Sequence, residues 1–427
     1  MSFLLFDPLY RASFLGSCLI CFCAGIMGVF IFLQKRALLS ELLSHATYPG
    51  LALGGVLATF SNTPLWFRFP LGAFVSCALA LWLLQVLEKQ KLSQDAAMST
   101  LMSGFFACGL LLTSYLQNKD ARIFLEMQKC FFGEVATLLD EHVIVYAILC
   151  FGTICFCYLF YRKIQWQLFD PQYIKISCSK DRFVDIFSGI FLIAAIIIGI
   201  RSCGVLLVSA MLIAPVAAAR MVASSLASLF VLSGLFGLFS GFLGNYLSIM
   251  CVLGRENGKM FLPPGPMIVL IAGLLVVLSY LFAPQKGLLA KSIRIFQFRF
   301  RAAQENCLKA LCSKERSLAE MQSILRLHRL SFFFFQRHMK REGLVQGKGR
   351  DLHLTEEGKK RALRIVRFHR LWEVYLTKHM DVSAKNVHPI AEEMEHVITP
   401  DLEKRLDHLL QKPEFDPHDQ PIPKRFS

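Results

Sequence analysis

The chain of 427 residues is 55% hydrophobic, contains 38 Phe and has only 18% charged residues. This composition excludes an ordinary pair of soluble domains and is typical of a protein that crosses a membrane several times. The formal net charge of +15 is spread unevenly, because Lys and Arg gather in loops and after about residue 284. The chain is therefore predicted to have two parts in different surroundings.

Apolar stretches long enough to cross a bilayer occupy the first two thirds of the chain. A membrane-spanning helix needs about 17–25 predominantly apolar residues. About nine such stretches predict eight or nine transmembrane helices, near residues 14–34, 44–61, 70–87, 96–116, 141–161, 184–200, 204–219, 225–250 and 265–283.

Basic residues at alternate ends of these stretches predict the orientation of the chain. They are Lys35, Arg36, Lys89, Lys91, Arg162, Lys163, Arg220 and Lys286. Cytoplasmic loops carry an excess of Lys and Arg, so these ends are predicted to be cytoplasmic, although the opposite loops hold Lys119, Arg122 and Lys129. The last span then ends in the cytoplasm.

One apolar stretch carries polar residues that suit a metal pathway. In "SELLSHATYPGLALGG" (Ser40–Gly55), Glu41 and His45 are four residues apart and would share one face of a helix. Polar groups are costly in lipid unless they face a partner or a pathway. The alternative is that Glu41 belongs to an interfacial loop and His45 is a hydrogen-bonded packing residue. Pro49 and Gly50 then interrupt the stretch.

Three segments, in this order, resemble the permease subunits of bacterial importers for zinc, manganese and iron. The first matches the family pattern Asp-Ala-x-Ser-His-Ala followed by Pro-Gly, except that Glu41 replaces the usual Asp. The second, "GVLLVSAMLIAPVAAAR", resembles Leu-Leu-x-x-Pro-Ala-x-x-Ala-Arg, and the third, "GPMIVL", has Met267 in place of Thr. The resemblance covers about residues 10–290. It implies a transport pathway that includes Glu41, His45, Pro49, Gly50 and Pro215.

The same resemblance implies partners. The chain contains no Walker A sequence, G-x-x-x-x-G-K-[ST], and no nucleophile elbow. It is therefore predicted to be a transporter subunit that binds no ATP itself, and not an enzyme. A permease of this kind needs a separate cytoplasmic ATPase subunit, an extracytoplasmic metal-binding protein and a second permease, in a homodimer or a heterodimer.

A basic segment follows the last span. "APQKGLLAKSIRIFQFRFRAAQEN" has no acid before Glu305, and a basic amphipathic segment beside a membrane can lie on anionic lipid headgroups. It could equally be a simple topology anchor. We expect a transmembrane permease domain over residues 1–284 and a juxtamembrane linker over 285–302.

Residues 303–362 are predicted to form a winged helix-turn-helix domain. "KERSLAEMQSILRLHRLSFFFFQRHMKREGLV" can hold two helices, and "VQGKGRDLHLTEEGKKRALRIV" indicates a strand, a turn with Gly, a second strand and a new helix. Basic residues on the turn would face DNA phosphates, unless they are only a solvated charge run. The predicted DNA contacts are Ser331, Arg337, His338, Lys340, Lys348 and Arg350.

The stretch "HPIAEEMEHV" (His388–Val397) contains four residues that can ligate a metal. On a helix, offsets of 4, 7 and 8 fall within roughly 80° of arc, so one face would carry His388, Glu392, Glu395 and His396. Upstream, His369 and Glu373 stand at i and i+4 of another helix. The alternative is a solvated charged surface. Nitrogen and oxygen ligands without Cys suit Mn²⁺, Fe²⁺ or Zn²⁺.

Four segments of the C-terminal part resemble the DtxR-type metal-dependent repressors. They are "MKREGLVQ", "LTEEGKKRALRIVRFHRLWEVYL", "VHPIAEEMEHVI" and "PEFDPHDQPIP". The resemblance covers about residues 303–427 and implies a metal-binding and dimerisation domain over 363–427. By position it implies one metal site at His369, Glu373 and His388, and another at Glu392, Glu395 and His396, with Asn306 where relatives supply Met or Asp.

Asn306 and the Phe run at 332–335 depart from the usual repressor pattern, whereas Glu392 matches one branch of the family. Glu392 stands where iron-type members have Cys and manganese-type members have Glu, which favours a harder ion such as Mn²⁺. The four consecutive Phe at 332–335 fall in the expected recognition helix, and they cannot all face inward. Some must be exposed, contact thymine methyl groups or pack on a partner.

These observations predict an all-α polytopic membrane domain followed by a soluble, mostly α-helical part. We expect the permease subunit of an ATP-driven Mn²⁺ or Fe²⁺ importer, with Zn²⁺ as a third candidate, fused to a repressor that binds operator DNA as a homodimer with Mn²⁺ or Fe²⁺ as corepressor. The alternative is a C-terminal metal sensor that gates the transporter and never binds DNA. We expect the chain in the bacterial inner membrane, with its C-terminal part in the cytoplasm or released there by cleavage near 285–303.

Overall fold

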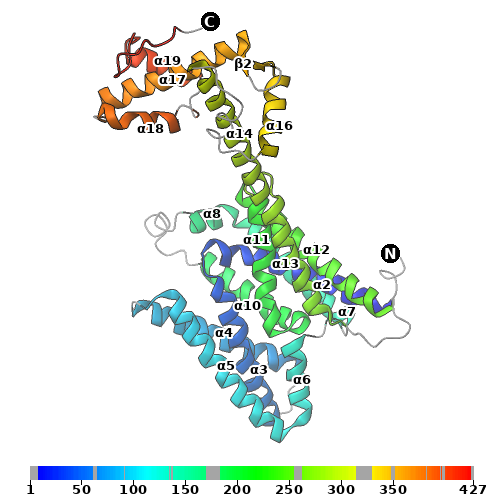
Figure 1. Ribbon diagram of the computed structural model, residues 1–427. Helices are drawn as coiled ribbons and strands as arrows, with labels where there is room; N and C mark the ends of the chain where they lie inside the picture. The colour runs from blue at the N-terminus through cyan, green and yellow to red at the C-terminus, as the bar shows by residue number, and fades with distance from the viewer. Residues whose placement is uncertain are drawn as a thin grey trace. The chain divides into compact units, whose positions relative to one another are not determined.

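The chain divides into two compact units, Met1–Ala290 and Lys291–Ser427. The computed structural model describes residues 8–60, 65–90, 92–133, 135, 138–169, 183–253, 262–313, 329–347, 352–380, 382–394, 396 and 400–424. In these residues both units are mainly helical (Figure 1). The predicted fold class is confirmed.

The first unit is a bundle of helices. They are α2 (Pro8–Leu33), α3 (Ala37–Phe60), α4 (Leu65–Lys89), α5 (Gln94–Lys119), α6 (Ala121–Phe132), α7 (Asp140–Leu159), α8 (Tyr161–Phe169), α10 (Phe183–Cys203), α11 (Val205–Val222), α12 (Leu226–Leu253) and α13 (Pro264–Phe282). Each predicted apolar stretch overlaps one of them, and the two short helices α6 and α8 come in addition.

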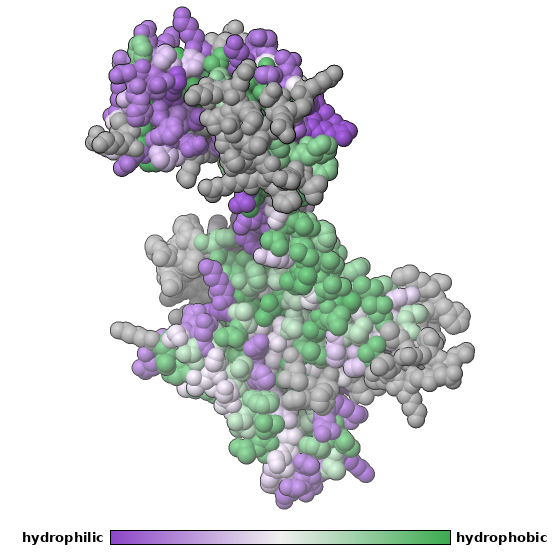
Figure 2. Space-filling model, viewed as in Figure 1, coloured by the Kyte–Doolittle hydropathy of each residue, from purple (hydrophilic) through white to green (hydrophobic). Residues whose placement is uncertain are grey.

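Among the described residues, seven helices are long and apolar enough to cross a membrane: α2, α4, α5, α7, α10, α12 and α13. The apolar part of α11 is shorter, at residues 207–222. Helix α3 carries Glu41 and His45, and these polar residues lower its hydropathy. On the face seen in Figure 2, apolar side chains cover much of this unit. Leu111 and Phe151, each 74% exposed, belong to such an apolar surface, as lipid-facing positions require.

Helix α2 lies at the centre of the bundle, where it packs against α7, α10, α11 and α12. Its Met27 and Val29 are completely buried. Near one end of α2, the amide of Asn245 on α12 donates hydrogen bonds to Ser13 at 3.0 Å and Ser17 at 3.2 Å. These bonds satisfy a buried polar side chain between two apolar helices.

Helix α3 packs closely against α4 through glycines. A Cβ atom on Gly50 would collide with the carbonyl oxygen of Gly72, and a Cβ atom on Gly72 would collide with that of Gly50. Small residues allow such close backbone approach between membrane helices. The pair fixes the separation of α3 and α4 next to Pro49, inside the helix that carries Glu41 and His45.

The second unit comprises α14 (Leu288–Ser313), α16 (Arg329–Arg341), β1 (Val345–Gln346), β2 (His353–Leu354), α17 (Glu356–His379), α18 (Ala384–Met394) and α19 (Pro400–Leu409). Helix α14 begins in the segment predicted as a linker and continues through it. Its Phe300 packs against Phe335, with ring centroids 5.5 Å apart, and against His338 at 5.2 Å. The packed core of this unit therefore begins before residue 303.

The hairpin that was expected after the recognition helix is present. Gly343 ends α16 with a φ of +68°, and Leu344 N–H donates to Met339 O at 3.1 Å, which is a Schellman ending. Strands β1 and β2 then pair antiparallel, Val345 with Leu354 and Gln346 with His353. The turn residues Lys348 and Arg350 lie outside the described residues, as does the segment 314–328 in which a further helix was predicted.

Helix α17 is the central element of the second unit. Its Trp372 and Leu376 pack with Val387 and Ala391 of α18 and Leu406 of α19. Its Leu371 and Val374 pack against Leu410 and Ile422 of the C-terminal tail. The helix therefore holds α18, α19 and the tail together, and it leads directly from the hairpin.

Candidate metal centre

Helix α17 positions two of the predicted ligands. Thr355 caps its first turn, because the Thr355 hydroxyl accepts the Gly358 N–H at 3.0 Å. Apolar residues on the buried faces of α17 hold it in place, and His369 and Glu373 follow one another by four residues on the same face. His369 is 4% exposed and Glu373 is 2% exposed.

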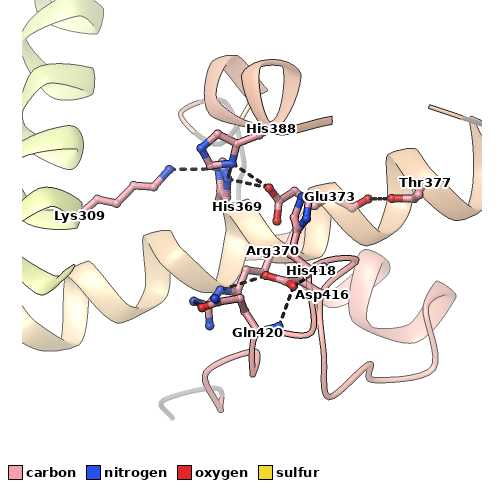
Figure 3. Close-up of polar contacts among 9 residues, drawn as sticks. All are labelled: Lys309, His369, Arg370, Glu373, Thr377, His388, Asp416, His418 and Gln420. Atoms are coloured by element: carbon pink, nitrogen blue, oxygen red, sulfur yellow. Dashed lines mark hydrogen bonds and ion pairs between the residues drawn. The ribbon is translucent and has the colours of Figure 1, made fainter. Parts of the chain in front are cut away.

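Helix α18 brings His388 to this pair (Figure 3). Nδ1 of His388 lies 2.8 Å from Nε2 of His369 and 2.9 Å from Oε1 of Glu373. Nε2 of His369 is 3.1 Å from the same carboxylate oxygen. Three metal-ligating atoms from two helices therefore meet at one point, and among the described residues they are a set whose geometry could hold an ion.

Glu373 is ionised in this arrangement. Burial favours the neutral acid, but hydrogen bonds and the charges of His369 and His388 outweigh burial and lower the pKa of Glu373 to about 2. The carboxylate is therefore available to a cation at any physiological pH.

A cavity of about 1000 Å³ adjoins the three ligands. Asn306 and Glu392 also line it, together with tail residues that include Asp416 and His418. The Asn306 side-chain oxygen is buried and has no hydrogen-bond partner among the described residues. A buried oxygen without a donor is uncommon in folded proteins, and it marks a place where a ligand can be accommodated.

The tail is fastened to α17 beside this cavity (Figure 3). Asp416 accepts the backbone N–H groups of His418 at 2.8 Å and Gln420 at 2.9 Å. Arg370 of α17 pairs with Asp416 at 3.4 Å and donates to the Pro421 carbonyl oxygen. The predicted segment "PEFDPHDQPIP" thus closes one side of the candidate site.

The donor set fits a divalent cation. Two imidazole nitrogens and one ionised carboxylate oxygen converge within 3.1 Å. Hydrogen bonds alone satisfy these three atoms poorly, because the N–H groups of both rings would have to donate to the same carboxylate oxygen. Neutral imidazoles and carboxylates are ligands for Mn²⁺, Fe²⁺ and Zn²⁺. The residues present therefore fit a divalent ion of this class.

The second predicted set is described only in part. Helix α18 is described as far as Met394. Nδ1 of His396 lies 2.6 Å from Oε2 of Glu305 on α14. Glu392 is exposed at the cavity, and Glu395 lies outside the described residues.

The structure describes the side chains of only some of the residues predicted to contact DNA. Arg337 is exposed on α16. His338 faces Glu342 at 3.2 Å, and Lys340 donates to the Gly347 carbonyl oxygen at 2.9 Å, which ties α16 to the hairpin. Ser331 lies in α16, and its side chain is outside what the structure describes.

The predicted transport residues lie in the first unit. Helix α3 starts at Ala37, so Glu41 is helical and not part of a loop, one turn before His45. Nδ1 of His45 is buried without a hydrogen-bond partner among the described residues, and its ring meets Phe106 edge-on at 5.0 Å. Pro49 lies within α3 and Pro215 within α11. The alternative, in which His45 is a hydrogen-bonded packing residue, stays a prediction, and no hydrogen bond to Nδ1 is found among the described residues.

The sequence did not predict the roles of two residues of α14. Glu305 contacts His396, and Lys309 places Nζ 3.1 Å from Nδ1 of His369. Glu305 directly precedes Asn306, the position that the resemblance indicated, and Lys309 follows Glu305 by one helical turn. The i, i+4 spacing of two charged residues was the available signal, but in sequence it cannot be distinguished from a surface ion pair.

Comparisons with known proteins match both parts of the chain. Residues 7–283 match the ABC 3 transport family, and residues 355–424 match the iron dependent repressor, metal binding and dimerisation domain. A probable metal transport system membrane protein of Chlamydia trachomatis is 32% identical over 439 residues, 98% of this chain and 97% of the relative.

Two further comparisons concern the membrane part. The manganese transport system membrane protein MntC of Bacillus subtilis is 26% identical, over 86% of this chain and 84% of the relative. The solved structure of PsaBC from Streptococcus pneumoniae in complex with Fab has a TM-score of 0.58 at 23% identity, over 68% of this chain and 98% of that one, which indicates a shared fold. The chain belongs to the ABC 3 transport family, and its metal-transport permease domain is joined to an iron-dependent repressor domain.

Proposed function

We propose that this chain is the permease subunit of an ATP-driven importer of Mn²⁺ or Fe²⁺, and that its second unit is a metal-responsive repressor of uptake genes. The observation that carries the proposal is the convergence of His369, Glu373 and His388 within 3.1 Å, in the unit that also contains the recognition helix and hairpin. Transport and metal sensing are thus joined in one chain.

The ligand set favours a hard or borderline ion. His369, Glu373 and His388 would hold one ion, and Glu305, Glu392 and His396 would contribute to a second. A bound divalent ion would supply positive charge beside the buried carboxylate of Glu373. No Cys is present among these ligands, and oxygen-rich sites suit Mn²⁺ better than soft thiolate sites do. The manganese transport named for one relative agrees with this choice, and Zn²⁺ remains the third candidate.

The second unit supplies the elements for coupling metal to DNA. Helix α17 carries ligands at its middle and follows the hairpin at its start. Helix α14 carries Glu305 and also Phe300, which packs on the recognition helix α16. We propose that operator affinity rises with metal because the same helices hold the ligands and support α16, in a homodimer. Rising metal would then repress uptake.

The permease half is proposed to act with partners. A separate ATPase subunit and an extracytoplasmic metal-binding protein complete an importer of this family, and a second permease completes the pathway. Glu41 and His45 of α3 would contact the transported ion. The basic residues at alternate span ends support a cytoplasmic position for the second unit, in a bacterial cell with the importer in its inner membrane.

The deciding experiment measures operator binding by the full-length chain in lipid nanodiscs. DNA from the promoter of the chain's own gene is titrated with protein in Mn²⁺, Fe²⁺, Zn²⁺ or chelator, beside His369→Ala. We expect metal-dependent binding that His369→Ala abolishes. Equal DNA affinity with metal and with chelator would reject the repressor.

A second candidate function is supported by the recognition helix. Phe333 is 57% exposed and Phe334 is 68% exposed on α16. Aromatic residues are enriched at protein interfaces, so this helix could contact the ATPase or the permease and gate transport without binding DNA. Metal binding without DNA binding in the nanodisc experiment, together with metal-dependent inhibition of transport in vesicles, would favour this function.

Release of the second unit from the membrane would give it free access to DNA. The segment proposed for cleavage, near 285–303, falls largely in α14, and residues 291–299 are exposed. Proteases cleave extended chain, so cleavage there requires local unfolding of α14. Immunoblots with a C-terminal tag test this point, because a fragment of the second unit should appear in cells grown with metal or without it.

A further inference from the structure

Lys309 of α14 contacts the metal-ligand cluster from outside it. Its Nζ lies 3.1 Å from Nδ1 of His369, and Nε2 of the same ring points to Glu373 and His388 (Figure 3). His369 is 4% exposed. The ring is therefore held between a lysine on one side and the cluster on the other.

The contact determines which ring nitrogen carries the proton. A lysine ammonium has three N–H donors and no acceptor. Nδ1 of His369 must then accept, so the proton of the neutral ring lies on Nε2, where it can be donated to Glu373. The lone pair of Nε2 is occupied by this proton.

Metal ligation needs the opposite tautomer. Nε2 is the atom that meets Glu373 and His388, so a metal at this point requires a free lone pair on Nε2 and a proton on Nδ1. The outer N–H of a ligating histidine normally donates to a carboxylate, a carbonyl or water. Here it would face the Lys309 ammonium, and two donors would oppose each other.

We propose that Lys309 is a positioning residue that holds His369 in the tautomer unable to bind metal, and so sets the metal concentration at which the site fills. The inference rests on the proposed metal site. Loading of the site requires the Lys309 ammonium to leave Nδ1, while the charge of Lys309 stays the same.

The contact also links the metal-ligand cluster to the helix that supports α16. Lys309 belongs to α14, which supplies none of the three atoms of the His369 cluster. Two buried neighbours of Lys309 on α14, Cys307 and Leu308, belong to the core that includes Phe335 of α16 and Ile365 of α17. The Lys309–His369 contact therefore adds a polar link at the ligand cluster to the apolar packing that already joins α14 to α17.

Three substitutions of Lys309 separate the effect of its charge on Mn²⁺ affinity from the effect of its hydrogen-bond donor. Lys309→Arg keeps a cation that can only donate, so it should stay near the wild-type Mn²⁺ affinity. Lys309→Met removes both the charge and the donor. Lys309→Gln removes the charge and adds a carbonyl oxygen that can accept a hydrogen bond from Nδ1–H of His369. This variant should therefore bind Mn²⁺ most tightly of the three, about 10–100-fold more tightly than wild type, which is the usual effect of exchanging the hydrogen-bond partner of a ligating histidine.

The test is competition between full-length protein in nanodiscs and a fluorescent chelator for Mn²⁺. Each variant is also made in the His369→Ala background, which accounts for Mn²⁺ bound in the transport pathway. We expect the affinity order Gln above Met above Lys and Arg, with no differences once His369 is replaced. Equal affinities for the Gln and Arg variants, while His369→Ala still removes a site, would overturn the inference and leave the metal site standing.

A second measurement reports the tautomer of His369 directly and does not depend on how the substituted side chain packs. Nitrogen-15 spectra of histidine in the metal-free, membrane-reconstituted chain distinguish protonated from unprotonated ring nitrogens, and His369→Ala assigns the signal. We expect the proton on Nε2 in the wild type and on Nδ1 in Lys309→Gln. A wild-type proton on Nδ1 would overturn the inference. Unchanged Mn²⁺ binding in His369→Ala would instead reject the proposed metal site itself.

Discussion

Glu305 on α14 accepts a hydrogen bond from His396, with Oε2 and Nδ1 2.6 Å apart and a separation of 91 positions in the chain. Arg301 lies one turn earlier on α14, 3.5 Å from the other oxygen of the same carboxylate. The resemblance indicated Asn306 as the ligand from this helix. The adjacent Glu305 offers a carboxylate oxygen, which is a better ligand for Mn²⁺ than an amide oxygen.

We therefore expect Glu305→Gln to impair the second metal site more than Asn306→Ala does. Mn²⁺ equivalents bound per chain, measured by equilibrium dialysis of the full-length protein, should fall for Glu305→Gln and remain for the control Glu357→Gln. Glu357 is an exposed residue of α17 that pairs with Arg361 at 3.6 Å. Loss of metal in Asn306→Ala alone would restore the original assignment.

Arg367 should be essential for the stability of the second unit. This arginine is 9% exposed, and it bonds both oxygens of Asp407 at 2.5 and 2.6 Å and the Pro423 carbonyl oxygen at 2.6 Å. It also faces Glu403, which is 2% exposed, at 3.4 Å. Arg367→Met leaves the buried Asp407 without its cation and leaves Glu403 with Arg364 alone, at 3.3 Å, which should cost about 3–5 kcal/mol.

The matched control for Arg367 is Arg361→Met on the same helix. The Arg361–Glu357 pair is exposed at 56% and 60% and is spaced i, i+4, so its loss should cost no more than about 0.5 kcal/mol. Hydrogen exchange of α17 and α19 in the full-length chain measures both effects. Similar protection in the two variants would contradict the prediction.

The Phe run on α16 should divide into residues needed for folding and residues free for binding. Phe335 is 2% exposed, whereas Phe334 is 68% exposed. Phe335→Ala should destabilise the second unit by about 3–5 kcal/mol, and Phe334→Ala by no more than about 0.5 kcal/mol. If α16 reads DNA, Phe334→Ala should nevertheless lower operator affinity, as measured by fluorescence anisotropy. Unchanged affinity and unchanged transport would assign no binding role to Phe334.

Much of the fold is predictable because its determinants are local. Apolar stretches of bilayer length identify the helices of the first unit, and Thr355 marks the start of α17 by its cap. The i, i+4 spacing of His369 and Glu373 places them on one face without knowledge of the fold. The alternation of buried and exposed Phe residues, with Phe332 and Phe335 inside, follows from helix periodicity.

The parts that were missed depend on contacts between distant segments. The pairing of Glu305 with His396 and of Lys309 with His369 spans 91 and 60 residues, and no local pattern contains it. The expectation of one helical face from His388 to His396 stays a prediction, because Glu395 lies outside the described residues. Helix α3 begins at Ala37, earlier than hydropathy indicated, because Glu41 interrupts an apolar pattern but not a helix.

The close approach of α3 and α4 should be required for transport. Gly50→Ala places a methyl group against the Gly72 carbonyl oxygen of α4, so the helices must separate, and overpacking of this kind costs about 1–3 kcal/mol. Because Gly50 and His45 belong to the same helix, radioactive Mn²⁺ uptake by cells should fall together with the thermal unfolding midpoint of the purified permease. Gly104→Ala on α5 is the control, since a Cβ atom there meets nothing within 4 Å, and it should leave both quantities unchanged. Normal uptake and stability in Gly50→Ala would show that α3 can move away from α4 without disturbing the pathway.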